Sequence, residues 1–578
     1  MRYSGARILV EALIDEGVDT VFGIPGGYVL HIYDELHKRE DRIRHILVSH
    51  EQHAAHAADG YARSSGKTGV CIATSGPGAI NLVTGIAAAY MDSVPLVAIT
   101  GNVPLPLLGK DSFQETDIAG ITMPVVKHNW IVKDVRELAE LIREAFIVAR
   151  TGRPGPVLID IPADVGAAEA EWKPAFVSAW EDGNALNSRA RRLSDRGGRV
   201  TFTGADIERA AAMLREARRP MIYAGGGVNS SGAAGEVAAL ADALKAPVAL
   251  SLMGIGAVPG DHPLCTGLIG MHGTLASNRA VQRSDLLIVL GARFSDRVTS
   301  RLDRFARNAR ILHIDIDPAE INKNRAADFW VIGDIKKILQ ALLKELPRSL
   351  ESRWNGEIER LKARSRASLY GRWRDAPGTS GPRPRFVIEE TAKRAGPNAL
   401  VVTDVGQHQM WAAQYYPAVP PRSFITSGGL GVMGFGLGAA LGAKLANPER
   451  PVVLFTGDGS FRMNNGELAT LSRYHIPLLI VLFNNGSLGM VRQWQRVFCG
   501  GVYSETALAP SPDFTALAAA YGIPAYRAAG EAALISALDS AAGDIAAGKA
   551  AFIEVLIDKD EMVLPMVPGG KAVDEQIL

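Results

Sequence analysis

Asp458 and Asn485 are the side chains of this sequence whose types and placement point most clearly to chemistry. Asp458 lies in the segment Gly457-Asp458-Gly459-Ser460, and Asn485 follows an apolar run further along the chain. A carboxylate oxygen, an amide oxygen and a loop carbonyl near Ser487 would make a weakly charged, all-oxygen ligand set. Mg²⁺ prefers such a set when substrate phosphates complete its octahedron, and Gly457 and Gly459 let the backbone approach closely. The alternative is a strand-end turn that carries a solvated Asp.

The elements around these residues support a ligand site. Pro451–Phe455 and Pro477–Phe483 are short apolar runs typical of buried parallel strands. Leu468, Leu471 and Tyr474 have the spacing of one helix face between them. Asp458 and Asn485 are therefore expected just past the carboxyl ends of two strands, where open α/β sheets bind ligands. The Gly-Asp-Gly-Ser segment alone is a weak signal, but its combination with Asn484–Asn485 across strand–helix–strand is specific.

This combination is the signature of thiamine diphosphate (ThDP) binding. The chain resembles ThDP-dependent enzymes, most closely the catalytic large subunit of the acetolactate (acetohydroxyacid) synthase family, from Gly5 to about Asp574. The resemblance implies three doubly wound α/β domains with parallel sheets, of the pyruvate oxidase/decarboxylase type. The expected parts are a pyrimidine-binding domain (1–170), a linker (171–203), a central FAD- or nucleotide-binding-like domain (204–345), a second linker (346–384) and a diphosphate-binding domain with a C-terminal tail (385–578).

Composition is typical of a soluble protein of two to four domains. The chain has 578 residues, 47% of them hydrophobic, 21% charged, and a net charge of +1, so charge gives no argument for nucleic acid or anionic membranes. No apolar run reaches 18 residues and no signal-peptide pattern opens the chain. The three cysteines are odd in number and far apart, which indicates a reducing compartment. We therefore expect a cytoplasmic protein with no nucleic-acid or membrane partner.

Alternating apolar runs and helical segments predict parallel sheets that are covered by helices. A helix is expected over Ala6–Glu16 and a charged helical stretch over Ser349–Arg374, followed by a Pro/Gly break at 377–384. The polar, turn-rich residues 171–203 predict a linker. Beyond the two strands above, those expected are Thr20–Gly23, Ile46–Val48, Val70–Ala73, Leu96–Thr100, Val157–Ile161, Met221–Ala224, Leu286–Leu290 and Ile311–Ile314.

The resemblance gives Glu51 a role in proton transfer. In the family, a Glu at this position hydrogen-bonds the aminopyrimidine of ThDP, which then removes the proton from the reactive carbon. On residue type alone, an acid at a helix N-terminus is the commoner explanation. Glu51 and Asp458 belong to different domains, and in the family they meet across a subunit interface. The resemblance therefore implies a homodimer or homotetramer, with a regulatory small subunit as a further partner.

Other cofactor positions also follow from the resemblance. Met433 matches the bulky side chain that bends ThDP, and Gln407 and His408 match residues near the diphosphate, although His408 alone suits a packed core equally well. Gly429-x-Gly431-x-x-Gly434 has the spacing of a dinucleotide-binding fingerprint, which needs a downstream acid to bind a ribose hydroxyl. The acid at that place is Asp458, which is already assigned to Mg²⁺, so the fingerprint is rejected. The positions assigned to ThDP and Mg²⁺ are Pro25, Gly26, Gly27, Glu51, Gln407, His408, Gly431, Met433, Gly457, Asp458, Gly459, Ser460, Asn485, Ser487, Leu488, Gly489 and Met490, with Asp458, Asn485 and Ser487 at the metal.

The central part of the chain carries the family's FAD-contacting pattern. The family holds FAD without using its redox chemistry, and the sequence alone indicates only a nucleotide-binding α/β domain. Glycines permit close approach, and the strand-end Asp315 could accept a ribose hydroxyl. The assigned positions are Arg153, Ala224, Gly225, Gly226, Met253, Gly270, Met271, His272, Gly291, Arg293, Asp315, Ile316 and Asp334.

An acceptor 2-keto acid needs a cation for its carboxylate and an apolar pocket. Arg297 supplies a guanidinium fork suited to a carboxylate. Gln114 could hydrogen-bond a bound intermediate. The resemblance assigns the pocket to Trp494, Met490, Val491, Met271 and Phe113. Taken alone, Trp494 or Phe113 would be interpreted as an ordinary core residue. The assignment to an acceptor pocket depends on the occurrence of all these residues in one sequence.

Six positions depart from the family pattern. Tyr28 and His31 stand where smaller residues are usual, His53 replaces a Gly, and Ala163 replaces a Lys. Ile80 and Asn102 also differ. Several of these positions lie near the cofactor or substrate channel in relatives.

Three functions are therefore weighed. The first is an acetolactate synthase-like enzyme, a ThDP-dependent transferase. It decarboxylates pyruvate and condenses the hydroxyethyl unit with pyruvate or 2-ketobutyrate, for branched-chain amino acid biosynthesis. The second is a related carboligase or decarboxylase that uses an aldehyde or ketone acceptor in specialised metabolism, as Tyr28, His31 and Ala163 suggest. The third is a non-catalytic paralogue, against which intact Glu51, Asp458 and Asn485 argue.

Overall fold

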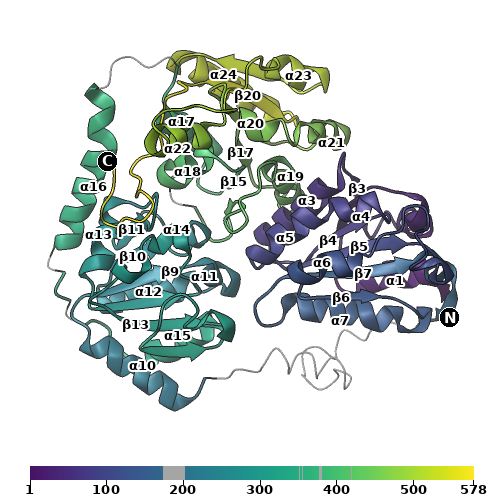
Figure 1. Cartoon of the computed structure of the whole chain (residues 1–578), viewed down its shortest axis with the longest axis horizontal. Helices are drawn as coiled ribbons and strands as arrows, with labels where there is room; N and C mark the ends of the chain where they lie inside the picture. The colour runs from purple at the N-terminus through teal and green to yellow at the C-terminus, as the bar shows by residue number, and fades with distance from the viewer. Residues whose placement is uncertain (173–201, 351, 355, 376–380, 418) are drawn as a thin grey trace.

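The computed structural model describes residues 1–172, 202–350, 352–354, 356–375, 381–417 and 419–578. Most of the linker expected over 171–203, and part of the break expected over 377–384, lie outside these residues. The described chain forms three six-stranded parallel sheets with flanking helices, and Figure 1 shows them as three lobes coloured purple to blue, teal, and green to yellow. The predicted α/β class with three doubly wound sheets is confirmed.

The N-terminal sheet has the strand order β3-β2-β4-β5-β7-β6. A two-stranded antiparallel ribbon, β1 with β8, lies beside it. The strands are β1 (Arg2–Ser4), β2 (Thr20–Gly23), β3 (Arg44–Leu47), β4 (Gly69–Ala73), β5 (Leu96–Asn102), β6 (His128–Ile131), β7 (Pro156–Pro162) and β8 (Glu169–Glu171). The helices are α1 (Gly5–Asp15), α2 (Leu30–His37), α3 (Glu51–Ser65), α4 (Pro77–Asn81), α5 (Val83–Met91), α6 (Ile118–Thr122), α7 (Leu138–Arg150) and α8 (Ala163–Ala167).

The middle sheet has the order β11-β10-β9-β12-β13-β14. Its strands are β9 (Pro220–Ala224), β10 (Val248–Leu250), β11 (Cys265–Leu268), β12 (Leu286–Leu290), β13 (Arg310–Asp315) and β14 (Phe329–Ile332). Its helices are α10 (Gly204–Glu216), α11 (Gly226–Ser231), α12 (Ala234–Leu244), α13 (Leu275–Arg283), α14 (Asp296–Thr299), α15 (Ile335–Glu345) and α16 (Glu357–Asp375). The helix expected from Ser349 begins only at Glu357, because the chain before it packs on the sheet: Trp354 is buried and its indole N–H donates to the Pro220 carbonyl (2.9 Å).

The C-terminal sheet has the order β16-β15-β17-β18-β20-β19. Its strands are β15 (Leu400–Thr403), β16 (Phe424–Ile425), β17 (Val452–Gly457), β18 (Leu479–Asn484), β19 (Ala525–Ala528) and β20 (Ala551–Leu556). Its helices are α17 (Pro384–Ala395), α18 (Gln407–Tyr415), α19 (Gly436–Ala446), α20 (Asp458–Phe461), α21 (Leu468–Tyr474), α22 (Gly489–Phe498), α23 (Phe514–Ala520) and α24 (Glu531–Ala546).

The strand orders show where each sheet can bind a ligand. Numbered along the chain, both outer sheets read second, first, third, fourth, sixth, fifth, so the first and third units share one topology. The middle sheet reads third, second, first, fourth, fifth, sixth, the order of dinucleotide-binding folds. The direction in which successive strands are added to the sheet reverses between the parallel neighbours β2 and β4, β15 and β17, and β9 and β12. Ligands of open sheets bind at the carboxyl ends of such neighbouring strands.

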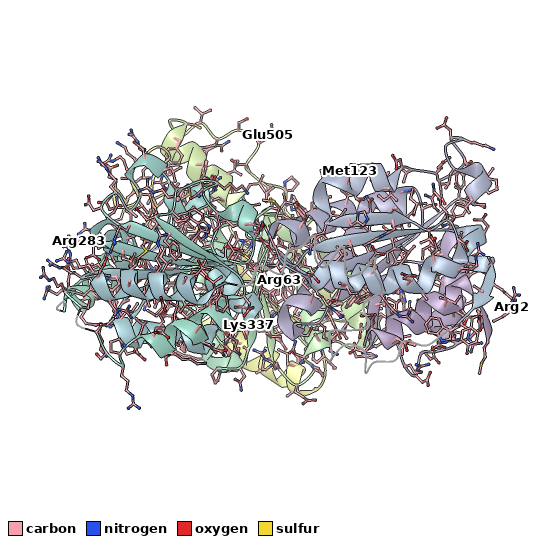
Figure 2. The ribbon with its side chains drawn as sticks, turned by 90° about the horizontal axis from the view of Figure 1, so that it is seen from below. Arg2, Arg63, Met123, Arg283, Lys337 and Glu505 are labelled. Atoms are coloured by element: carbon pink, nitrogen blue, oxygen red, sulfur yellow. The ribbon has the colours of Figure 1, made fainter. Side chains whose placement is uncertain are left out.

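Helices α3 and α19 join the first and third units at very close range. A Cβ atom added at Gly442 would lie 1.8 Å from the Ala57 carbonyl oxygen, and one at Gly60 would lie 2.1 Å from that of Ala439. Only glycine lets the two backbones touch in this way. Arg63 of α3 lies at the same junction (Figure 2), where its guanidinium donates to the Thr426 carbonyl (2.9 Å). One apolar core therefore extends through both units.

The chain after β20 crosses from the C-terminal unit to the middle unit. The Val567 N–H donates to the Met271 carbonyl (2.8 Å), and Val573 is fully buried in an apolar cluster of the middle unit. Figure 1 shows this yellow segment running past α13. Among the described residues, no helix combines the length and apolar character needed to span a membrane.

Candidate functional site

Asp458 lies at the first residue of α20, directly after β17, and its side chain is buried. Only 2% of the residue is exposed, and its Oδ2 has no hydrogen-bond partner among the described residues. Burial raises the pKa of Asp458 to about 7, against the lowering effect of backbone N–H groups and of Arg462. An unpartnered buried carboxylate is costly unless a cation or donor binds it. This oxygen therefore fits a bound divalent cation.

Asn485 follows β18, which pairs in parallel with β17, so the two proposed metal ligands lie at one edge of the sheet. The Asn485 Oδ1 accepts from the Ser487 N–H (3.1 Å), and its Nδ2 donates to Gln407 Oε1 (3.2 Å). The Ser487 hydroxyl donates to the Thr506 carbonyl (2.9 Å). These bonds fix the loop and leave Asp458 and the amide oxygen of Asn485 as the hard oxygen donors that Mg²⁺ prefers.

These residues line an open pocket of about 450 Å³. A side chain at either glycine on its walls would crowd its neighbours, because a Cβ at Gly457 would lie 2.8 Å from His408 Nδ1 and one at Gly459 would lie 2.7 Å from Leu488. Burial lowers the pKa of His408 to about 3, and its Nε2 has no partner among the described residues. The lining residues are Val405, Gly406, Gln407, His408, Trp411, Met433, Gly457, Asp458, Gly459, Ser460, Phe483, Asn485, Ser487, Leu488, Gly489, Met490, Val491 and Ile557. Of the positions assigned to ThDP, those of the C-terminal unit except Gly431 are gathered here.

A second group of predicted residues gathers at the carboxyl edge of the N-terminal sheet. Glu51 is the first residue of α3, and Asn81 Nδ2 donates to its Oε2 (3.0 Å). The Tyr28 hydroxyl donates to the Phe113 carbonyl (3.1 Å), and Phe113 itself is 81% exposed. Gln114 has a φ of +59°, a strained value of the kind found at functional sites.

Within one chain, no residue of the N-terminal group lines the C-terminal pocket. All residues that line the C-terminal pocket lie between Val405 and Ile557, whereas Glu51 and Gln114 pack against Gly78 and Gly76 of the N-terminal sheet. Each group alone carries only part of the residues expected for one ThDP site.

The positions assigned to FAD lie mainly around the switch point of the middle sheet. Gly225 and Gly291 follow the adjacent strands β9 and β12, and their loops touch: a Cβ at Gly225 would lie 2.1 Å from the Gly291 carbonyl oxygen. Asp315, at the end of β13, is buried, which raises its pKa to about 6. A nucleotide fits these loops and this carboxyl.

Two assigned side chains have structural partners instead. Arg153 pairs with Glu320 (2.7 Å) and Asp317 (3.3 Å), joining the N-terminal unit to the middle unit. Asp334 caps α15 by accepting from the Lys337 N–H (3.0 Å), which satisfies a helix-end donor. Neither bond excludes a nucleotide, but both explain these residues without one.

Arg297 and Trp494 meet where the middle and C-terminal units face each other. The Arg297 Cζ lies 5.6 Å from the centroid of the Trp494 ring, a cation–π contact. The Arg297 side chain is 62% exposed, and its ion pair with Asp296 is long at 3.7 Å. The guanidinium group of Arg297 is therefore available to bind a carboxylate.

Two of the departures from the family pattern, His53 and Asn102, have local partners. His53 Nδ1 lies 3.0 Å from Glu467 Oε1, which also accepts from the Ser49 N–H (2.9 Å). Asn102 Nδ2 donates to Asp160 in the buried core (2.5 Å). Ala163 begins α8. Sequence reasoning did not single out Glu467, a buried acid that directly precedes α21.

Comparison with known proteins agrees with this geometry. The chain matches three family models: "Thiamine pyrophosphate enzyme, N-terminal TPP binding domain" over residues 3–121, the "central domain" over 207–342, and the "C-terminal TPP binding domain" over 404–555. It is 45% identical to the acetolactate synthase isozyme 2 large subunit of Escherichia coli K12, with 99% of both chains covered. It is 45% identical to the acetolactate synthase large subunit of Parasynechococcus marenigrum (98% and 90% covered) and 44% identical to that of Corynebacterium glutamicum (99% and 89% covered).

Proposed function

Because this chain belongs to the acetolactate synthase large-subunit family of thiamine diphosphate enzymes, we propose that it decarboxylates pyruvate and condenses the two-carbon unit with a second 2-keto acid. Acetolactate formation in branched-chain amino acid biosynthesis is the activity that this family membership supports. The observation that carries the proposal is Arg297 placed over Trp494 beside the cofactor pocket. This pair offers a cation and an aromatic wall to an acceptor carboxylate.

The cofactors are part of the proposal, and the residues fit them. Asp458 and Asn485 would hold Mg²⁺, with a carbonyl near Ser487, and Gly457 and Gly459 would leave room for a diphosphate. When bound, ThDP supplies a carbon nucleophile that also accepts the electrons released as CO₂ leaves. FAD would occupy the switch point of the middle sheet without redox use, as in the family.

The chain's own residues supply proton handling and acceptor binding. Glu51, held by Asn81 Nδ2 (3.0 Å), would exchange a proton with the pyrimidine of the cofactor. Arg297 would bind the acceptor carboxylate through two parallel N–H bonds. Gln114, held in its strained backbone conformation, would hydrogen-bond the reacting molecule.

The site would be completed by a second copy of the chain. The N-terminal group does not line the C-terminal pocket of its own chain, and large apolar side chains are exposed on both units. On the N-terminal unit these are Leu30, Ile80, Phe113, Ile121 and Met123; on the C-terminal unit they are Leu430, Met463 and Val491. Exposed apolar groups of this kind mark protein interfaces. A homodimer or homotetramer with sites between copies is therefore proposed.

Two further parts of the proposal come from the relatives. They are named as large subunits, so we propose a smaller regulatory partner for this chain, and co-purification of a tagged chain would test it. A cytoplasmic location is consistent with three free cysteines, of which Cys71 and Cys265 are buried. Cell fractionation would test the location.

The reaction can be tested with pyruvate, Mg²⁺, ThDP and FAD. Isotopically labelled pyruvate should give labelled CO₂ and 2-acetolactate, identified by NMR before any acid treatment. Release of CO₂ with no acetolactate would reject this product and would favour the second candidate, a carboligase that uses another acceptor.

Replacing Tyr28 with Ala should shift acceptor choice. The Tyr28 ring occupies space beside the Phe113 loop and its hydroxyl holds that loop. Removing it should favour 2-ketobutyrate over pyruvate as acceptor by about tenfold, the size of effect expected when a pocket gains room for extra methylenes. The measurement is the product ratio when both keto acids compete. Tyr28→Phe is the matched control, because it keeps the ring and should keep the ratio; equal ratios in all three proteins would reject this role.

A further inference from the structure

A chain of side-chain amides joins the proposed metal site to the C-terminal tail. Asn485 Nδ2 donates to Gln407 Oε1 (3.2 Å), and Gln407 Nε2 donates to Gln493 Oε1 (2.9 Å). Gln493 then pairs with the tail backbone at Val563, accepting from its N–H (2.8 Å) and donating to its carbonyl (3.1 Å). A second bond, from Gln407 Nε2 to the Glu561 carbonyl (2.8 Å), reinforces the same connection.

Gln407, Gln493 and Val563 are buried and Asn485 is partly buried, so each hydrogen bond constrains the next. Gln407 is 4% exposed, Gln493 is 3% exposed and Val563 is fully buried. A buried amide that loses its partner pays the full cost of desolvation. Because Gln407 presents its oxygen to Asn485 and its nitrogen to Gln493, the amide oxygen of Asn485 is held on the side away from Gln407. The tail thus helps to fix the orientation of a proposed metal ligand.

The same tail segment continues to the middle unit. Met566 is buried, and its sulfur lies 3.4 Å from Gln493 Nε2. The next residue, Val567, donates its N–H to the Met271 carbonyl (2.8 Å). Met271 in turn donates its own N–H to the Arg297 carbonyl (2.8 Å), so the tail is linked to the backbone of Arg297. Gln493 therefore stands between the metal site on one side and the proposed acceptor site on the other.

We propose that Gln493 is a positioning residue that couples occupancy of the Mg²⁺–ThDP pocket to docking of the tail, residues 558–578. The inference rests on the proposed function for the identity of the ligand. Coupling of this kind is reciprocal. Tail docking strengthens Mg²⁺–ThDP binding, and Mg²⁺–ThDP binding in turn protects the tail.

The test uses the full chain and two measurements other than activity. Calorimetry measures the dissociation constant of Mg²⁺–ThDP, and trypsin cleavage after Lys559 and Lys571, followed by mass spectrometry, measures tail docking. In the parent protein, Mg²⁺–ThDP should slow both cleavages. In Gln493→Met, which keeps the side-chain length and removes both polar atoms, protection should disappear and Mg²⁺–ThDP should bind about tenfold more weakly, within the usual range of coupling between sites.

Two further variants make the test decisive. Gln340→Met is the matched control: Gln340 is an exposed glutamine of α15 that bonds Glu236 (2.9 Å), so the same change of side chain there should leave both Mg²⁺–ThDP affinity and tail protection unchanged. Gln493→Glu retains the acceptor oxygens and loses the donor to Val563, so it should show a smaller loss, and it replaces the Met variant if that protein does not fold. Parent-like protection and affinity in the Gln493 variants would overturn the coupling. Absence of Mg²⁺–ThDP binding by the parent protein would instead overturn the proposed function.

Discussion

Replacing Asp458 with Asn is expected to abolish Mg²⁺–ThDP binding and to lower product formation by at least about 1000-fold. The carboxylate is buried, its Oδ2 has no partner among the described residues, and it lies at the sheet edge with Asn485. Loss of the charge removes several kcal/mol of metal binding, and each 1.4 kcal/mol is about tenfold. Calorimetric titration and the pyruvate assay measure the two effects. Asp539→Asn, an exposed acid of α24, is the matched control and should behave as the parent.

The same substitution should stabilise the cofactor-free protein at alkaline pH. The pKa of Asp458 in the folded chain is raised by burial from 3.8 to about 7. Its protonated form therefore contributes stability that is fully present below about pH 4 and is lost as pH rises through about 7. Above that pH, Asp458→Asn should unfold at a higher temperature than the parent, with an upper bound of about 4 kcal/mol. The advantage should vanish near pH 4; an unchanged difference across this range would show that Asp458 is not the titrating group.

Replacing Glu51 with Gln is expected to lower the rate of product formation by about 10² to 10⁴, the contribution of a positioned acid–base group. Gln keeps an oxygen that accepts from Asn81 Nδ2, so the bond seen at 3.0 Å can persist while the exchangeable proton is lost. Mg²⁺–ThDP affinity should change little, because the metal ligands lie in the C-terminal unit. The measurement is kcat beside a calorimetric dissociation constant.

Two outcomes would contradict this role for Glu51. A variant with parent-like kcat would show that the carboxyl does not exchange the proton. A variant that fails to bind Mg²⁺–ThDP would place Glu51 in binding rather than in proton transfer. Glu208→Gln, on the exposed face of α10, is the matched control for the change from acid to amide.

Local sequence signals predicted part of each sheet and the strand ends that carry Asp458 and Asn485. The apolar runs Thr20–Gly23 and Leu286–Leu290 have the bounds of β2 and β12, because a strand buried on both faces needs apolar side chains throughout. Asp458 and Asn485 fall at adjacent strand ends because a strand–helix–strand unit returns the chain to the same edge. Their roles as metal ligands stay predictions, as do the FAD assignments.

Features that depend on long-range packing could not be predicted. The pair His53–Glu467, and the bond between Tyr28 and the Phe113 loop, join residues distant in the sequence. The tail's path along Gln493 and into the middle unit depends on backbone bonds, which carry no residue-type signal. Arg153 and Asp334, which the resemblance assigns to FAD, form an interdomain ion pair and a helix cap, and their contacts with a nucleotide stay predictions. Polar residues at strand ends serve structure and ligand binding alike, and only geometry separates the two uses.

Mixing two inactive variants tests most directly whether Glu51 and Asp458 of different copies form one site. In a mixed dimer of Glu51→Gln and Asp458→Asn, one site has both substitutions and the other has neither. If subunits exchange freely, half of the dimers are mixed, so the mixture should recover about a quarter of the parent rate of acetolactate formation. If Glu51 and Asp458 of the same chain formed one site, every site would carry one of the two substitutions and the mixture would stay inactive. No recovery, after subunit exchange has been verified by mass spectrometry, would contradict the account.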